Sequence, residues 1–156
     1  MHLTYHLAGP SDLDLLVRTR IQVLRAANLL PEDAPLPAVE DTTRPYYQTA
    51  LANGDHVAYL VFDGNLWVGS GGVSFYQVMP TVRNPSGRKA YIMNMYTRPD
   101  YRCRGIASYV LDLLVQEARQ RGVAQIGLEA TAMGRPVYES YGFLPAGAEM
   151  ELVQQP

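Results

Sequence analysis

Cysteine is almost absent from this 156-residue sequence, which contains only Cys103. One cysteine cannot form an internal disulfide, and no cysteines and histidines are spaced as zinc ligands, so we expect no metal and a reducing, cytoplasmic location. Long apolar runs are also lacking, because nowhere do about 18 apolar residues follow one another. No basic segment precedes an apolar stretch near Met1. The sequence therefore predicts neither a membrane span nor an export signal.

An excess of one charge is lacking as well. The chain carries 13 Lys and Arg against 15 Asp and Glu, a formal net charge of −2. This balance gives no long-range attraction for nucleic acid, so no nucleic-acid partner is expected and any basic site must be local. With 47% apolar residues, the chain is long enough for one core but not for two, and we expect a single domain over residues 1–156.

Alternation and helical periodicity predict an α/β chain. Residues 1–7 alternate as a strand, and Ser11 is expected to cap a helix with apolar positions at Leu13, Val17, Ile21 and Leu24. A loop from Pro31 to Pro37 leads to a second helix that stops at Asn53-Gly54.

The second half of the chain is predicted to alternate strands and helices. Segments rich in β-formers flank Asp63-Gly64-Asn65 and predict a hairpin, in which Gly69-x-Gly71-Gly72 provides either close backbone spacing or a bulge. Parallel strands at 91–97 and 125–130 enclose an amphipathic helix that begins near Ile106 and ends at Gly122. A short helix at 133–142 and a final strand at 148–153 complete the expected order.

Three arginines, Arg98, Arg102 and Arg104, precede the amphipathic helix. The first turn of a helix leaves backbone N–H groups unpaired, and the helix dipole favours an anion there. Gly105 allows a phosphate to approach the backbone without a Cβ, and arginines donate charge-assisted hydrogen bonds. The segment predicts a pyrophosphate site; the alternative is that the arginines are solvated and Gly105 only makes a turn. Neither a Walker loop nor the three-glycine dinucleotide fingerprint is present, which argues against nucleotide hydrolysis and hydride transfer.

The segments "NMYTRPDYRCRGIASYVLDLLVQEA" and "IGLEATAMGRPVYESYGF" resemble the GNAT superfamily of acetyl-CoA-dependent N-acetyltransferases. Two motifs in the correct order carry the resemblance, Arg102-x-x-Gly105-x-Ala107 and Tyr138-Glu139-x-x-Gly142-Phe143. It implies a mixed, twisted central sheet flanked by helices on both faces, with the parallel strands at 91–97 and 125–130 splayed apart. It also implies acetyl-CoA as co-substrate and a primary amine of a small molecule or peptide as acceptor.

The resemblance also implies how acetyl-CoA is held. The backbone of Met95, Tyr96 and Thr97 would pair with its pantetheine arm like an added strand. The pyrophosphate would be bound by the following loop and helix start, namely Arg102, Cys103, Arg104, Gly105, Ile106, Ala107 and Ser108. Many relatives hold pantetheine with an asparagine near the end of the second strand; here that region reads Ala130-Thr131, and Thr131 would take the place of the asparagine.

Tyr138 matches the position of the family's general acid, which would protonate the departing thiolate. The base is open: relatives carry a glutamate where this chain has Asn94, which cannot accept a proton at neutral pH. Glu129 on the facing strand is one candidate, and a water relay is the other. Cys103 has no histidine near it in the sequence, so direct transfer in a ternary complex is expected rather than an acyl-cysteine.

The remaining candidates are given structural interpretations. His2, His6 and His56 show no ligand spacing and are expected at the surface, while Met93 and Met95 are expected to fill the core.

In this family the acceptor is normally chosen by segments that correspond here to 28–47 and 78–90. The first is acidic, which would attract a cationic amine, although a solvated loop is the alternative. The acidic residues are Glu32, Asp33, Glu40 and Asp41, and an aromatic wall is offered by Tyr46, Tyr47, Trp67, Phe75 and Tyr76.

Other functions and assemblies stay open at this point. A non-catalytic acyl-CoA-binding module is the alternative to an enzyme, supported by Asn94 and opposed by Tyr138. A nucleotide-phosphate binder is a third possibility. Short terminal strands are compatible with a homodimer.

Overall fold

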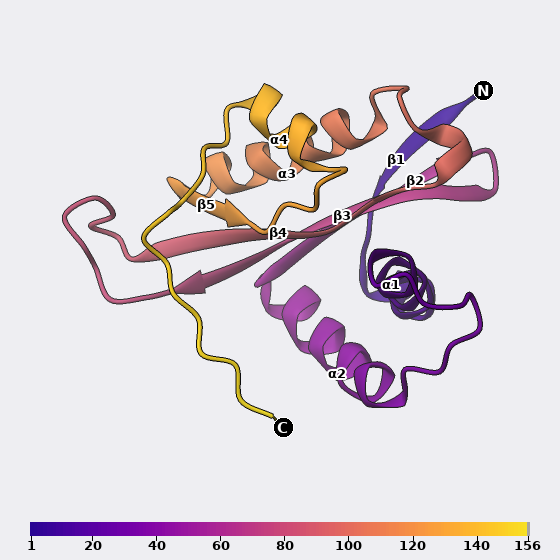
Figure 1. Cartoon of the computed structure of the whole chain (residues 1–156), viewed down its shortest axis with the longest axis horizontal. Coiled ribbons are helices and arrows are strands. Elements are labelled where there is room, and N and C mark those ends of the chain that lie inside the picture. Colours follow the sequence, from indigo (N-terminus) through magenta and orange to yellow (C-terminus); the bar gives the residue numbers. More distant parts are fainter. Residues whose placement is uncertain (156) are drawn as a thin grey trace.

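The computed structural model describes residues 1–155, which form a five-stranded sheet between two layers of helices (Figure 1). The strands lie in the order β1-β2-β3-β4-β5. All neighbours are antiparallel except β4 and β5, which are parallel, so the predicted mixed sheet is confirmed. The strands are β1 Leu3–Leu7, β2 His56–Asp63, β3 Leu66–Gln77, β4 Arg88–Thr97 and β5 Gln125–Leu128.

The helices divide between the two faces of the sheet (Figure 1). One face is covered by α1 (Leu13–Ala27) and α2 (Pro37–Asn53), and the other by α3 (Ile106–Gln120) and α4 (Arg135–Tyr141). Because side chains alternate along a strand, neighbours on β2 serve both layers. Leu60 belongs to the core cluster beneath α1, and Val61 to the cluster that contains Leu111 and Leu114 of α3.

Glycines in the left-handed region end the elements where the sequence predicted stops. Gly54 (φ +82°) ends α2, and Gly64 (φ +59°) turns the hairpin between β2 and β3. The register shifts at the glycines of β3, although no glycine is the extra residue: Ser70 faces Tyr96 and Gly72 faces Met93, so Gly71 faces two residues of β4. The extra residue lies on β4, where Asn94 has φ +60°. Asparagine tolerates this region better than most residues.

Two predictions at the ends of the chain are wrong. Ser11 does not cap α1, because Pro10–Asp12 forms a 3-10 turn and Asp12 occupies the capping position. Pro10 has a backbone angle suited to a tight turn, and the Asp12 carboxylate accepts a hydrogen bond of 2.8 Å from the Gly9 N–H.

The predicted final strand at 148–153 does not form. Met150 and Leu152 are 98% and 85% exposed. Alternation indicates which side chains would share a face, but a strand also needs a neighbour with which to pair, and alternation does not supply one. Across residues 1–155, no helix combines the length and apolar character needed to cross a membrane.

Candidate functional site

The sheet parts between β4 and β5. The two strands pair only from Lys89 opposite Gln125 to Ile92 opposite Leu128, whereas β4 continues to Thr97. The predicted splay is therefore present, although the second strand ends at Leu128 rather than at 130. Beyond Ile92, that edge of β4 has no strand partner among the described residues. An extended ligand can pair with the free backbone groups there.

Side chains on the free part of β4 pack against other residues on both faces of the sheet. Met95 packs against the core cluster beneath α3, as predicted. Tyr96 stacks on Trp67, with ring centroids 5.2 Å apart and planes 12° apart. The Thr97 hydroxyl is buried and has no hydrogen-bond partner within residues 1–155. The strand is thus anchored by its side chains while its backbone edge stays open.

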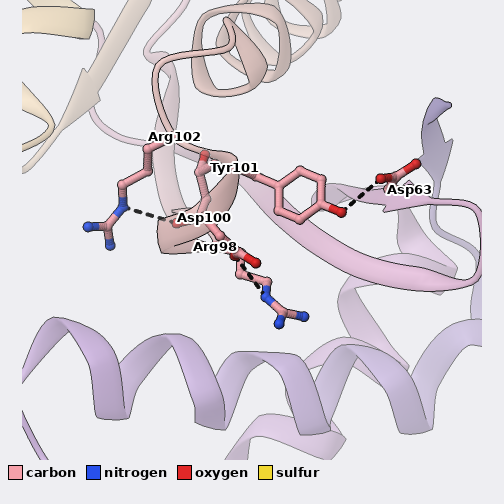
Figure 2. Close-up of polar contacts among 6 residues, drawn as sticks. Asp63, Arg98, Asp100, Tyr101 and Arg102 are labelled. Atoms are coloured by element: carbon pink, nitrogen blue, oxygen red, sulfur yellow. Dashed lines mark hydrogen bonds and ion pairs between the residues drawn. The ribbon is translucent and has the colours of Figure 1, made fainter. Parts of the chain in front are cut away.

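A short turn joins β4 to the arginine-rich loop (Figure 2). Within this turn, Pro99–Tyr101, the Tyr101 hydroxyl donates a 2.7 Å hydrogen bond to Asp63 at the end of β2. Arg98 pairs with Asp100 at 3.0 Å, so this arginine is already neutralised. Arg98 is therefore less available to an anion than Arg102 and Arg104, which have no carboxylate partner in the described part of the chain.

The loop enters α3 through two left-handed residues, Cys103 (φ +61°) and Gly105 (φ +80°). A Cβ placed on Gly105 would meet no atom within 4 Å, so the space above the helix start is open. Arg102 donates from Nε to the Thr97 carbonyl at 3.3 Å, and Arg104 lies 5.0 Å from the centre of the Tyr101 ring. Neither arginine is within 4.0 Å of a carboxylate in the described part of the chain. Cys103 is exposed.

Tyr138 lies on α4 and is only 9% exposed. Burial raises the pKa of its hydroxyl above the ordinary value, so the group keeps its proton at neutral pH. The ring meets Phe143 edge-on, with centroids 6.2 Å apart. Thr131 lies in the turn before this helix, where its hydroxyl accepts a 3.1 Å hydrogen bond from the N–H of Gly134, the capping residue.

Glu129 lies just past the end of β5 and is exposed. Burial, followed by the negative charge of Glu129, raises the pKa of Tyr91 on β4, which places the carboxylate beside that ring.

A cavity of about 840 Å³ lies between α1, α2 and the strands β3 and β4. Four residues of the predicted aromatic wall line it, namely Tyr46, Tyr47, Phe75 and Tyr76, whereas Trp67 instead stacks on Tyr96. The acidic residues expected to attract an amine do not line it. Glu40 and Asp41 face a separate groove, and the carboxylate of the cavity belongs to Asp55.

His56 contradicts its prediction as a surface residue, since it is only 4% exposed. The packing of α2 over β2 and β3 buries it: Tyr46 and Tyr47 meet its ring edge-on, and Ser74 Oγ lies 3.0 Å from its Nδ1. Burial, with the nearby charge of Arg20, lowers the pKa of His56 to about 4, so the ring is neutral at pH 7. His2 and His6 are exposed as predicted.

Arg20 is a residue of the cavity that motif reasoning missed. It lies on α1 and donates from Nη1 to Asn94 Oδ1, 3.2 Å away on the bulge of β4. One signal was available in the sequence: Arg20 is three and four residues from the buried Val17 and Leu16, so an arginine occupies the apolar stripe of an amphipathic helix.

Comparison with known proteins shows which family this architecture resembles. Residues 23–143 match the model of the acetyltransferase (GNAT) family. A predicted acetyltransferase from Clostridium acetobutylicum, whose crystal structure contains acetyl-CoA, is 35% identical, with 97% of this chain and 96% of that chain covered and a TM-score of 0.89. A GCN5-related N-acetyltransferase from Ralstonia eutropha JMP134 is 26% identical over 97% of this chain and 99% of its own, with a TM-score of 0.82.

More distant structures share the fold alone. Glucosamine-6-phosphate N-acetyltransferase from Arabidopsis thaliana is 12% identical, with a TM-score of 0.70 over 99% of this chain and 100% of that one. No curated protein sequence matches this chain.

A mixed sheet opened beside an arginine-rich helix start defines the architectural class of N-acetyltransferases that use acetyl-CoA. The chain belongs to the acetyltransferase (GNAT) family, as its two motifs predicted.

Proposed function

We propose that this enzyme binds acetyl-CoA along the free edge of β4 and at the start of α3, and transfers the acetyl group to a primary amine of a small molecule or peptide. The observation that carries the proposal is the continuity of these two features. The edge at Met95, Tyr96 and Thr97 leads within a few residues to the loop that begins at Arg102.

The residues present suit the two parts of coenzyme A. Open backbone groups of β4, together with the unpartnered hydroxyl of Thr97, suit the amide-containing pantetheine arm. Arg102 and Arg104, which lack carboxylate partners among the described residues, suit a pyrophosphate. The backbone from Cys103 to Ser108 adds donors at a helix start, and Thr131, three residues beyond the end of β5, would offer its hydroxyl to the pantetheine arm.

The acceptor amine must lose a proton before it can attack. An alkylammonium has a pKa of about 10.4, which at pH 7 corresponds to roughly 4 kcal/mol against the neutral form. Glu129 or a water relay would take this proton. Asn94 cannot, since its amide has no basic site and its oxygen accepts from Arg20.

The chemical step forms an N–C bond and breaks the C–S bond of the thioester. The nitrogen gives its remaining excess proton to solvent, the departing thiolate takes the Tyr138 hydroxyl proton, and solvent then returns a proton to Tyr138. The raised pKa of Tyr138 keeps this proton in place until the thiolate forms. Transfer is direct, within a complex that contains both substrates.

Calorimetric titration with acetyl-CoA tests the binding site. Gly105→Glu adds negative charge and bulk at the helix start, and Gly105→Ala is its matched control. Both replacements accept the same left-handed backbone angle, at a cost of roughly 1 to 2 kcal/mol. We expect Gly105→Glu to abolish binding and Gly105→Ala to retain it within about tenfold. Equal affinity of the two variants, both folded by circular dichroism, would contradict the proposed pyrophosphate site.

Turnover with an amine panel tests the catalytic roles. Tyr138→Phe should lower kcat by about 10²-fold while leaving acetyl-CoA affinity unchanged. In Glu129→Gln, a pH profile of kcat/KM that loses its lower limb identifies a carboxylate base, and an unchanged profile identifies a water relay. A Tyr138→Phe enzyme of full activity would remove the assigned acid.

A further inference from the structure

The cavity beneath β3 and β4 contains a partly buried arginine that faces no carboxylate. Arg20 is the only Lys or Arg among the cavity's lining residues, and within residues 1–155 it has no ion-pair partner. Its only side-chain hydrogen bond in this part of the chain is to the neutral amide of Asn94, at 3.2 Å. A guanidinium has five N–H donors in a planar fork, so most of its donors stay available to a ligand.

The groups around Arg20 make it a site for an anion. Burial lowers the pKa of Arg20, which reflects the cost of removing the charge from water. Tyr47 and His56 approach it without a negative charge: burial raises the pKa of Tyr47 to about 12 and lowers that of His56 to about 4, so both are neutral at pH 7. Asp55, the carboxylate of the cavity lining, is exposed to solvent. A bound anion would offset the desolvation of Arg20.

Arg20 lies near the edge of β4 at which we propose that acetyl-CoA binds. Its partner Asn94 occupies the bulge of β4, immediately before the open edge at Met95. Helix α1, which carries Arg20, crosses beneath these strands (Figure 1). An anionic group bound by Arg20 would therefore hold the remainder of a small acceptor beside the edge that we propose for acetyl-CoA.

We propose that the acceptor is a primary amine that also carries a carboxylate, an amino acid in chemical class, and that Arg20 binds this carboxylate. The inference rests on the proposed function. A carboxylate suits one guanidinium, which can bind both of its oxygens. A phosphate dianion calls for more positive charge than this cavity supplies, because its lining has no second Lys or Arg. Tyr46, Phe75 and Tyr76 leave the amino acid side chain a largely apolar surface.

Matched acceptors test the proposal without needing the natural substrate. Each of a set of amino acids, including phenylalanine and leucine, is compared with its decarboxylated amine, and kcat/KM is measured for the wild type and for Arg20→Gln. The ratio of wild type to variant is taken separately for each acceptor, so that differences in amine reactivity cancel. Arg18→Gln, an exposed neighbour on α1 that does not line the cavity, is the matched control.

We expect Arg20→Gln to lower kcat/KM about 10- to 100-fold for amino acids and less than about threefold for the decarboxylated amines. Arg20→Lys, which keeps the charge but loses the planar fork, should fall between. Arg18→Gln should leave both acceptors unchanged. Titration with acetyl-CoA accompanies every variant, and an unchanged affinity separates loss of the acceptor from loss of the cofactor.

Three results would overturn the inference. An equal loss for both members of each pair would give Arg20 a purely structural role. A larger loss for glucosamine 6-phosphate than for any amino acid would make the ligand a phosphate. A loss below about threefold for amino acids and decarboxylated amines alike, with efficient wild-type turnover of both, would leave the proposed function intact and remove only the carboxylate. By contrast, no turnover with any amine would reject the proposed function and this inference together.

Discussion

Buried polar residues give the cavity its chemistry. His56 contacts the Tyr46 and Ser74 hydroxyls through Nδ1, while its Nε2 is buried without a hydrogen-bond partner in the described residues. A charged imidazolium in this position would be removed from water and would lie close to the positive charge of Arg20. The folded protein therefore favours the neutral ring, and protonation of His56 at low pH destabilises the fold.

His56→Gln should make the protein less sensitive to acid. The unfolded chain protonates His56 below about pH 6.5, whereas the folded protein does so only near its pKa of about 4. As the pH falls between these values the unfolded state binds the extra proton, so stability is lost; above pH 6.5 the effect is absent. We expect the wild type to lose about 3 kcal/mol more than His56→Gln between pH 7 and pH 4.

Urea unfolding across this pH range measures the difference in unfolding free energy between the two proteins. The contributions of carboxylates that titrate in both proteins cancel in this difference. Parallel curves for the two proteins would show that the histidine titrates normally in the fold.

Much of the candidate site could be predicted from contiguous residues, but the positions of the cavity residues Arg20 and His56 could not. The loop from Arg102 to Gly105 was predictable because its residues are contiguous and adjoin a strongly periodic helix. Arg20 and Asn94 are 74 residues apart, and their contact depends on how α1 crosses β4. His56 is buried because α2 packs over it, and nothing in its immediate sequence reports that packing.

At the scale of elements, α3 approaches the sheet closely through a glycine of β3. A Cβ on Gly71 would lie 2.5 Å from Val110 Cγ1 and 2.6 Å from the sulfur of Met95. Both neighbours belong to the core beneath α3, and Val110 is only 1% exposed. The glycine thus determines how near the helix lies to the strand that carries the open edge.

Gly71→Ala should destabilise the protein by about 1 to 3 kcal/mol, because the added methyl group overpacks a filled core. Gly127→Ala on β5 is the matched control: its Cβ would meet no atom within 4 Å, and we expect a change below about 0.5 kcal/mol. Urea unfolding measures both. A stable Gly71→Ala protein would mean that α3 can shift away from the sheet at little cost.

Element prediction succeeded where period and stop signals agreed. The helix expected from Ile106 with a stop at Gly122 is observed as Ile106–Gln120, because its apolar stripe and its glycine are both local. The predicted strand at 148–153 failed, since its alternation had no neighbour to pair with. The order of the sheet likewise depends on contacts that no single segment encodes, and it was not predicted.

At the scale of the molecule, the helices on both faces share one sheet, so the two core clusters are coupled through β2 and β3. Leu60 and Val61 are adjacent in the chain and nearly inaccessible, yet they belong to different clusters. Neither layer can lose its packing without exposing the same strands. We therefore propose that residues 1–156 form one domain.

Unfolding should therefore follow a single transition. Trp67, the only tryptophan, packs with the cluster beneath α1, so its fluorescence reports on that layer. Far-ultraviolet circular dichroism reports on all helices, including α3 and α4. We expect the two urea curves to coincide. Separate midpoints would divide the chain into layers that unfold independently.

The open edge of β4 also has a consequence for the protein in the cell. An unpaired strand edge can pair with another chain, which makes it a site of aggregation. Under the proposed mode of binding, acetyl-CoA would cover this edge and stabilise the fold by mass action, by about 2.7 kcal/mol at a concentration one hundred times the Kd. The metabolic supply of the acetyl donor would then govern how long each molecule survives, in addition to how fast it works.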